Sequence, residues 1–439
     1  MPISFQNMLH HPGFLKYFKN ISWLFVEKLF RLGLGLLVGI WVARYLGPSQ
    51  FGLFNYVISF VSLFAAFAAF GLDGIVIREL VRDASKIDKL LGTAFGIKIL
   101  GAMAVLGMLF VAVDFTSNDR FTNILVFIVA GSIFFQSFNV IDAYFQSVVL
   151  SRYVVFANMI SSLIVSFLKI VLIMTNASLV AFVWVVLLES VFLVLGFIYF
   201  YSKTKGSIFT WRFDKTTALI LLKDSWPIML SGFVISIHMK IDQVMIKELL
   251  GSESVGQYAA AVRLSEVWYF VPLIISSSVY PAIIHAQILS TELYYQRLQR
   301  LYDMLIWTAL IIALPMTFIA PWVIEVLYGN AYHQAGNILM LHIWSGVFVF
   351  FGTARHKWVL SQNLQRYEIF LDVISAFLNI ILNIILIPRY GVVGAVYATL
   401  LSYCLGSIGL SIFIKEFHIS LIMFFKTFLL PVRLIRGKY

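Results

Sequence analysis

The chain has 439 residues, of which 61% are hydrophobic and only 12% are charged, and its mean hydropathy is +0.92. Soluble domains carry roughly a quarter of their residues as Asp, Glu, Lys and Arg, so this composition excludes a soluble protein. Apolar runs of about 20 residues, the length of a helix that crosses a bilayer, recur from end to end. They are continuous rather than alternating, which excludes a transmembrane β-barrel. The sequence therefore predicts an all-α polytopic membrane protein.

Twelve transmembrane helices are predicted from these runs. The first half of the chain has spans at roughly 21–43, 52–72, 91–113, 121–144, 153–175 and 178–201. The second half has spans at roughly 225–247, 258–283, 303–323, 336–354, 367–387 and 391–414. Little more than Asn176–Ala177 separates the fifth span from the sixth, so we expect a tight hairpin there.

The net charge of +11 is distributed by side of the membrane. Of the 32 Lys and Arg residues, 22 lie at the two ends and in the connections after even-numbered spans, and four lie in the connections after odd-numbered spans. The positive-inside rule then places both termini in the cytoplasm. The basic charge is thus an orientation signal and a contact for anionic membrane lipid, and nucleic acid is not a predicted partner.

Two short glycine strings stand at equivalent places in the two halves. Leu46–Phe54 and Leu250–Tyr258 both read L-G-x4-G-x-aromatic, and each follows the first span of its half. Tight turns explain either string alone. Their equal placement predicts two six-helix bundles related by a pseudo-two-fold axis along the membrane normal, as in transporters built from parallel repeats.

The longest cytoplasmic connection separates these halves and sets the predicted domains. They are a six-helix bundle with an interfacial leader at 1–201, a cytoplasmic linker at 202–224, a six-helix bundle at 225–414 and a basic cytoplasmic tail at 415–439. Met8–Lys19 and Ser420–Arg436 mix apolar and basic residues, which suits helices lying in the cytoplasmic interface. A charge-anchored tail without function is the alternative.

Signals of catalysis are missing from the sequence. No phosphate-binding loop follows the glycines, and no histidine spacing fits a metal site, so no cofactor or metal is predicted. The single cysteine, Cys404, cannot form an internal disulfide. Asp114 and Asp119 are the candidate carboxylates of the short outer loops, and we interpret them as solvated turn residues. An enzyme is therefore not expected.

Charged residues inside the predicted spans are the candidate functional residues. The cations are Lys28, Arg31, Lys98, Lys240 and Arg263, and the carboxylates proposed for ion coupling are Asp242 and Glu266. Each costs about 2.5–3.5 kcal/mol at the middle of a membrane helix. Pairing of Arg31 with Glu27 four residues earlier, or of Asp242 and Glu266 with Lys240 and Arg263, would lower that cost. The alternative is a hydrated cavity between the halves, where cations meet substrate and a carboxylate binds a proton or sodium ion.

Two stretches carry a family resemblance. Ser22–Val81 resembles the opening of O-antigen flippases, and Met239–Pro281 resembles the start of the second half of that family, within the superfamily of multidrug, oligosaccharidyl-lipid and polysaccharide exporters. The specific strings are ARYLGP, GLDGI-x-x-REL, KIDQVM and GQYAAAVRLSE. Together the two stretches cover about a quarter of the chain directly.

This resemblance implies a bacterial inner-membrane flippase that works by alternating access. Its substrate would be an undecaprenyl-diphosphate-linked oligosaccharide, its coupling ion a proton or sodium ion, and its partners a polysaccharide polymerase and chain-length machinery. Lys28, Arg31, Lys240, Asp242, Arg263 and Glu266 would line a basic cavity. Three alternatives stay open: a cation-coupled exporter of drugs or metabolites, a lipid-intermediate flippase of peptidoglycan synthesis, and a membrane glycosyltransferase or polymerase.

Overall fold

The computed structural model describes residues 12–435, and within that range every regular element is helical. The chain forms two compact units. The first unit consists of the residues up to Leu46 together with Tyr56–Ser236, and the second consists of Gly47–Asn55 together with the residues from Ile237 onward. Along the chain, the unit therefore changes at three places, after Leu46, after Asn55 and after Ser236, and each of these places lies inside a helix. The domain boundaries expected from the sequence remain predictions.

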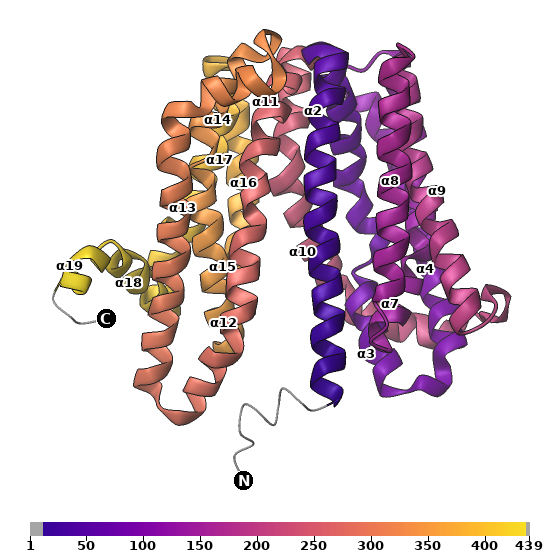
Figure 1. Ribbon diagram of the computed structural model, residues 1–439, viewed down its shortest axis with the longest axis horizontal. Helices are drawn as coiled ribbons and strands as arrows, with labels where there is room; N and C mark the ends of the chain where they lie inside the picture. Colours follow the sequence, from indigo (N-terminus) through magenta and orange to yellow (C-terminus); the bar gives the residue numbers. More distant parts are fainter. Residues whose placement is uncertain (1–11, 436–439) are drawn as a thin grey trace. The chain divides into compact units, whose positions relative to one another are not determined.

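Long helices make up most of each unit (Figure 1). The chain runs through α2 (Pro12–Ala69), α3 (Leu72–Arg82), α4 (Ile87–Ala112), α5 (Arg120–Ala130), α6 (Ser132–Gln136), α7 (Val140–Ser147), α8 (Arg152–Met174), α9 (Leu179–Thr204) and α10 (Lys215–Leu250). It continues through α11 (Ser252–Glu266), α12 (Phe270–Leu289), α13 (Thr291–Tyr328), α14 (His333–His342), α15 (Ser345–Gln362), α16 (Gln365–Tyr390), α17 (Val392–Cys404), α18 (His418–Thr427) and α19 (Leu430–Ile435).

Short 3-10 turns and one π-helical turn join these helices. The 3-10 turns are η1 (Ala84–Lys86), η2 (Val113–Phe115), η3 (Ser137–Asn139), η4 (Ile208–Thr210), η5 (Val267–Tyr269), η6 (Asn330–Tyr332), η8 (Leu410–Phe413) and η9 (Lys415–Phe417), and the π-helical turn is η7 (Leu405–Gly409).

The number of apolar helices agrees with the prediction of about twelve spans. Among the described residues, ten helical stretches are long and apolar enough to cross a membrane, or eleven when the bent pair Asn330–His342 and Ser345–Gln362 is one span. One stretch, Ser22–Arg82, has 61 residues, about three times the length that one crossing needs. Gly47 interrupts it with non-helical backbone angles. Counting that stretch as two crossings adds one, which gives twelve.

The connection between the eighth and ninth predicted spans is a hairpin of two helices instead of a loop. α12 ends at Leu289 and α13 begins at Thr291, so only Ser290 separates them. The 38 residues of α13 would extend over about 57 Å, well beyond the roughly 30 Å of a hydrocarbon core. Hydropathy predicts only the apolar part of this helix as a span, at roughly 303–323. The polar residues before it form the first turns of the same helix.

The tail packs into the second unit rather than lying apart from it. Leu421, Met423 and Phe424 of α18 are buried, and Met423 and Phe424 join the apolar core that α13 and α15 form. Figure 1 shows α18 beside α13. Of the expected interfacial leader at Met8–Lys19, the part before Pro12 lies outside the described residues, and from Pro12 on the backbone is continuous with α2.

The predicted linker folds against the beginning of α4 in the first unit. The Arg212 N–H donates to the carbonyl of Asp88 over 3.1 Å. Gly92 allows this approach, because a Cβ atom there would lie 2.5 Å from the Arg212 nitrogen. Asp214 then caps α10 by accepting from the Thr217 N–H over 2.7 Å, and it pairs with Lys89 over 3.0 Å.

The two glycine strings contact each other within the second unit. A Cβ atom on Gly52 would lie 1.7 Å from the carbonyl oxygen of Ser252, and one on Gly256 would lie 2.0 Å from the carbonyl oxygen of Pro48. Pro48 and Ser252 hold the same position in their strings, as do Gly52 and Gly256. The contact is therefore reciprocal, and each glycine gives room to the backbone of the other string.

Candidate functional site

A buried carboxylate on α10 is the centre of a polar cluster inside the second unit. Asp242 is only 5% exposed. Its Oδ2 accepts hydrogen bonds from the Tyr258 hydroxyl of α11 over 2.7 Å and from the Thr399 hydroxyl of α17 over 2.6 Å. Its Oδ1 accepts from the Asn383 amide of α16 over 2.6 Å. Three neighbouring helices thus supply donors to one carboxylate.

A second amide extends this network by one helical turn. The Oδ1 of Asn379 accepts from the Asn383 amide over 3.2 Å, because residues four apart on α16 share a face. Asn379 itself donates to the Ser402 hydroxyl over 3.4 Å. The Oδ1 of Asn383 is buried and has no hydrogen-bond partner in the described part of the chain. We call Asp242, Tyr258, Asn379, Asn383 and Thr399 the Asp242 cluster.

The donors that bind Asp242 are all electrically neutral. Within residues 12–435, no Lys or Arg nitrogen lies within salt-bridge distance of its carboxylate, so the ion pair considered with Lys240 is not formed. A buried charge without a counter-charge is costly. A proton or one small cation would remove that cost. The carboxylate, the hydroxyl of Thr399 and the orphaned Oδ1 of Asn383 are oxygen ligands of the kind that hard cations prefer.

The other candidates of the second unit surround this cluster. Lys240 and Glu266 are half-buried, and Glu266 lies within electrostatic range of both Lys240 and Asp242. Arg263 is half-buried on α11 and lies within electrostatic range of Tyr328. The structure therefore brings Lys240, Asp242 and Glu266 into one electrostatic neighbourhood.

The candidates of the first unit are divided between two ion pairs and an exposed cation. Arg31 binds Glu27 over 3.1 Å, and its side chain is 46% exposed whereas Glu27 is buried. Lys28 is exposed on the same helix. Lys98 is buried on α4 and contacts Asp73, a partner that the sequence pattern did not indicate. Asp142 on α7 lies within electrostatic range of Lys98, Asp73 and Glu27.

Several buried polar residues of the second unit are not among the candidates that the sequence predicts. Asn379 and Asn383 are uncharged, yet their spacing of four in an apolar run was a visible signal of a polar helix face. Arg355 is also buried, and it donates to the Ser407 carbonyl over 2.8 Å and lies 3.8 Å from Glu368. It follows directly after the predicted span 336–354, where the sequence predicts a loop.

Comparison with known proteins gives consistent results for sequence and fold. The sequence model described as "Polysaccharide biosynthesis protein" matches residues 17–287. A "Probable flippase AglR" of Haloferax volcanii is 24% identical over 415 residues, which cover 90% of this chain and 81% of that protein.

Two solved structures resemble the fold over nearly its whole length. The lipid II flippase MurJ in an inward closed conformation aligns with a TM-score of 0.70 at 16% identity, covering 95% of this chain and 93% of that one. An inward-facing multidrug resistance transporter of the MATE family aligns with a TM-score of 0.66 at 16% identity, covering 96% and 100%. The family match spans more than half of the chain, and the chain therefore belongs to the polysaccharide biosynthesis protein family, with the fold of transporters of the MOP superfamily.

Proposed function

We propose that this chain is a flippase that moves a lipid-linked oligosaccharide from one leaflet of the membrane to the other. Membership of the polysaccharide biosynthesis family and the likeness to AglR, which is named a probable flippase, support this function. The likeness of fold to MurJ and to a multidrug transporter supports a transporter rather than a catalyst. From the resemblance of the opening strings, we further propose undecaprenyl diphosphate as the carrier, O-antigen or a related surface polysaccharide as the product, and the inner membrane as the location.

The mechanism that we propose rests on the uncharged surroundings of the Asp242 carboxylate. We infer that a proton or sodium ion binds at the Asp242 cluster and that its release drives a conformational change. With the ion bound, the carboxylate is neutralised and can stay buried among Tyr258, Asn383 and Thr399. After release, the bare charge favours a conformation in which water reaches it. A difference of ion concentration across the membrane then shifts the populations of two conformations, which is the requirement for alternating access.

The basic residues have a separate role in this proposal. Lys28 and Arg31 are exposed on α2 and can meet the diphosphate of a lipid-linked sugar, and a guanidinium can donate two parallel hydrogen bonds to phosphate. Lys98 is buried and held by Asp73, so it is less accessible to a phosphate than Lys28 and Arg31. Lys240 and Arg263 are the corresponding candidates of the second unit.

A cellular and a reconstituted experiment test the function. Deleting the gene should make a lipid-linked oligosaccharide accumulate on the cytoplasmic leaflet, and the wild-type chain should reverse this. In liposomes, the purified protein should move a fluorescent lipid-linked oligosaccharide faster when a sodium or proton gradient is imposed. Absence of both accumulation and liposome transport would refute the flippase function, and a changed drug tolerance in the deletion strain would favour the exporter alternative.

A further inference from the structure

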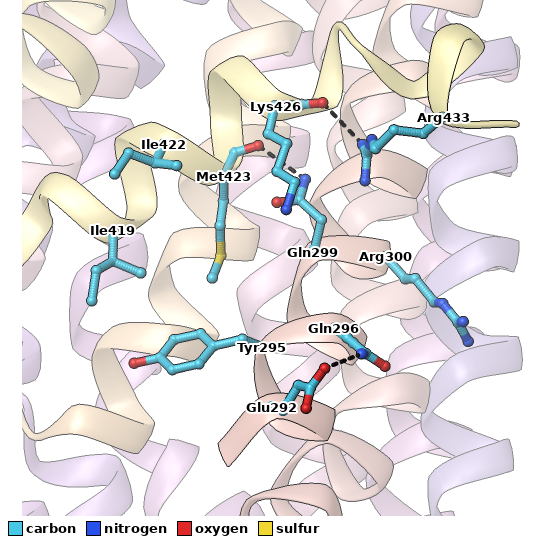
Figure 2. Close-up of a pocket in the computed structure, with 10 residues that line it drawn as sticks. All are labelled: Glu292, Tyr295, Gln296, Gln299, Arg300, Ile419, Ile422, Met423, Lys426 and Arg433. Atoms are coloured by element: carbon cyan, nitrogen blue, oxygen red, sulfur yellow. Dashed lines mark hydrogen bonds between the residues drawn. The ribbon is translucent and has the colours of Figure 1, made fainter. Parts of the chain in front are cut away.

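A cavity of about 850 Å³ lies between the polar beginning of α13 and the two C-terminal helices. Figure 2 shows its lining: Glu292, Tyr295, Gln296, Gln299 and Arg300 come from α13, and Ile419, Ile422, Met423, Lys426 and Arg433 come from α18 and α19. All of these residues belong to the second unit. The cavity is separate from the Asp242 cluster, with which it shares no residue.

Buried hydrogen bonds hold the C-terminal helices against α13, so the cavity has a built wall. The Gln299 amide donates to Asp303 over 2.8 Å and to the Met423 carbonyl over 3.0 Å. The Tyr302 and Ser420 hydroxyls lie 2.8 Å apart. The contacts of Gln299 with Met423 and of Tyr302 with Ser420 join residues more than 110 positions apart in the sequence, and they fix α18 on α13.

Arg433 completes this wall rather than facing a ligand. One of its terminal nitrogens donates to Asp303 over 2.8 Å and to the Lys426 carbonyl over 2.9 Å. Asp303 is buried, so the pair anchors α19 on α13. Arg433 is therefore a positioning residue for α19.

Two exposed cations also line the cavity, together with exposed apolar residues. Arg300 on α13 and Lys426 on α18 are exposed and line the same cavity. Ile419 and Ile422 line the cavity as well and are exposed. Beyond the cavity, Phe425, Phe428 and Val432 continue an exposed apolar surface along the tail. Positive charge beside an apolar helix face is the composition that binds anionic lipid at a membrane interface.

We propose that this cavity binds the headgroup of one anionic phospholipid of the surrounding bilayer. Arg300 and Lys426 contact the phosphate, and Ile419 and Ile422 contact the beginning of the acyl chains. The predicted orientation, in which the connection before α13 and the C-terminal tail are both cytoplasmic, places this lipid in the cytoplasmic leaflet. Charge complementarity selects the lipid, because a zwitterionic headgroup would bring its own cation close to Arg300 and Lys426.

Binding of phosphatidylglycerol to the purified full chain tests this site. We expect the wild-type protein to retain phosphatidylglycerol more tightly than phosphatidylcholine in native mass spectrometry. The double variant Arg300→Gln/Lys426→Gln should bind phosphatidylglycerol about tenfold more weakly, because each basic group near an anionic surface contributes measurably to lipid binding. Both side chains are exposed, so the variant should fold normally. The matched control is Lys205→Gln/Arg366→Gln, which removes the same charge from exposed positions outside the cavity.

Two outcomes would overturn the proposal. Equal phosphatidylglycerol affinity in the wild type and the double variant would show that the cavity is not the binding site. Retention of undecaprenyl diphosphate, but not of phosphatidylglycerol, by the wild type would assign the cavity to the transported lipid instead. Neither result depends on transport activity, so failure here is distinguishable from failure of the proposed flippase function.

Discussion

The amide of Asn383 donates to the carboxylate of Asp242 over 2.6 Å, while the carbonyl oxygen of the same amide is buried without a hydrogen-bond partner in the described part of the chain. A half-turn of this amide would exchange the two atoms and direct an oxygen at the carboxylate. That orientation suits a bound cation, whereas the present one suits a bare or protonated carboxylate. The pair can therefore respond to ion binding without any movement of the backbone.

Substitution of Asp242 by Asn should separate folding from ion coupling. The variant keeps the size of the side chain, so we expect normal abundance in the membrane. It loses the group whose charge changes, so transport in liposomes should no longer depend on the sodium or proton gradient. Glu266→Gln is the comparison, since Glu266 is less buried and lies outside the hydrogen-bonded cluster. If both variants transport normally with an intact gradient dependence, neither residue is the coupling site.

Substitution of Arg31 tests the proposed phosphate contact. Arg31→Gln should give a stable, correctly inserted protein with severely reduced surface polysaccharide, and Arg31→Lys should be intermediate because it keeps the charge but loses the planar fork. Glu27→Gln is the control, since it breaks the same ion pair and leaves the guanidinium in place. Wild-type polysaccharide in Arg31→Gln, or equal losses in Arg31→Gln and Glu27→Gln at matched abundance, would mean that Arg31 is only a structural partner.

Gly52 should tolerate no side chain. Gly52→Ala places a Cβ atom against the Ser252 carbonyl, and relief of such overpacking typically costs about 1–3 kcal/mol. Gly107→Ala is the matched control, because a Cβ atom there meets nothing within 4 Å and alanine favours the helix by roughly 0.5–1 kcal/mol. Thermal unfolding in detergent should show a lower midpoint for Gly52→Ala and an unchanged or higher one for Gly107→Ala. Equal midpoints would argue against the reciprocal contact.

Acid should loosen the linker from α4. Hydrogen bonds from Thr217, with a smaller contribution from Lys89, lower the pKa of Asp214 from 3.8 to about 2. Because the pKa of Asp214 is lower in the docked linker, its ionised carboxylate stabilises docking at every pH above the ordinary pKa of about 4. That stabilisation is lost as the pH falls from about 4 towards 2. Hydrogen exchange at Ile208–Asp214, measured by mass spectrometry, should be slow at pH 5 and faster near pH 2.5 after correction for intrinsic rates. In Asp214→Ala the exchange should already be fast at pH 5.

The orientation of the chain can be tested with single cysteines. In a Cys404→Ser background, a cysteine at Ser117 should react with an impermeant thiol reagent in intact cells, and a cysteine at Lys205 should not. Both positions are exposed or half-exposed in loops between helices. Labelling at position 205 from outside would reverse the predicted topology and the direction of transport.

Helical class and span number could be predicted because a helix satisfies every backbone polar group within lipid, so apolar length reports each crossing. The boundaries of α13 could not, because polar residues such as Glu292 continue a helix that hydropathy no longer detects. Asp242 could be identified as a candidate functional residue because it is a charged residue in an apolar run. Its partner Thr399 lies 157 positions away, and no pattern in a single sequence predicts a contact between residues so far apart.

The ion pair of Lys98 was missed for a different reason. Asp73 follows directly after the predicted second span, where the sequence predicts a connection, whereas the structure continues the chain there as α3. A carboxylate placed at the end of a span can reach a cation inside a neighbouring helix. Span boundaries that are wrong by a few residues can thus hide a partner even when its position in the sequence is plain.

The reciprocal contact of the glycine strings also sets an order of events during synthesis. Gly52 and Gly256 lie 204 positions apart, and at about 5–20 residues per second a ribosome needs about 10–40 s to pass from one to the other. During that interval the string around Gly52 has no partner, whereas the hairpin of α8 and α9 can already close. The second unit is thus completed by a segment made long before the rest of it, and a pause in translation between the strings would prolong the exposure of this segment to competing contacts.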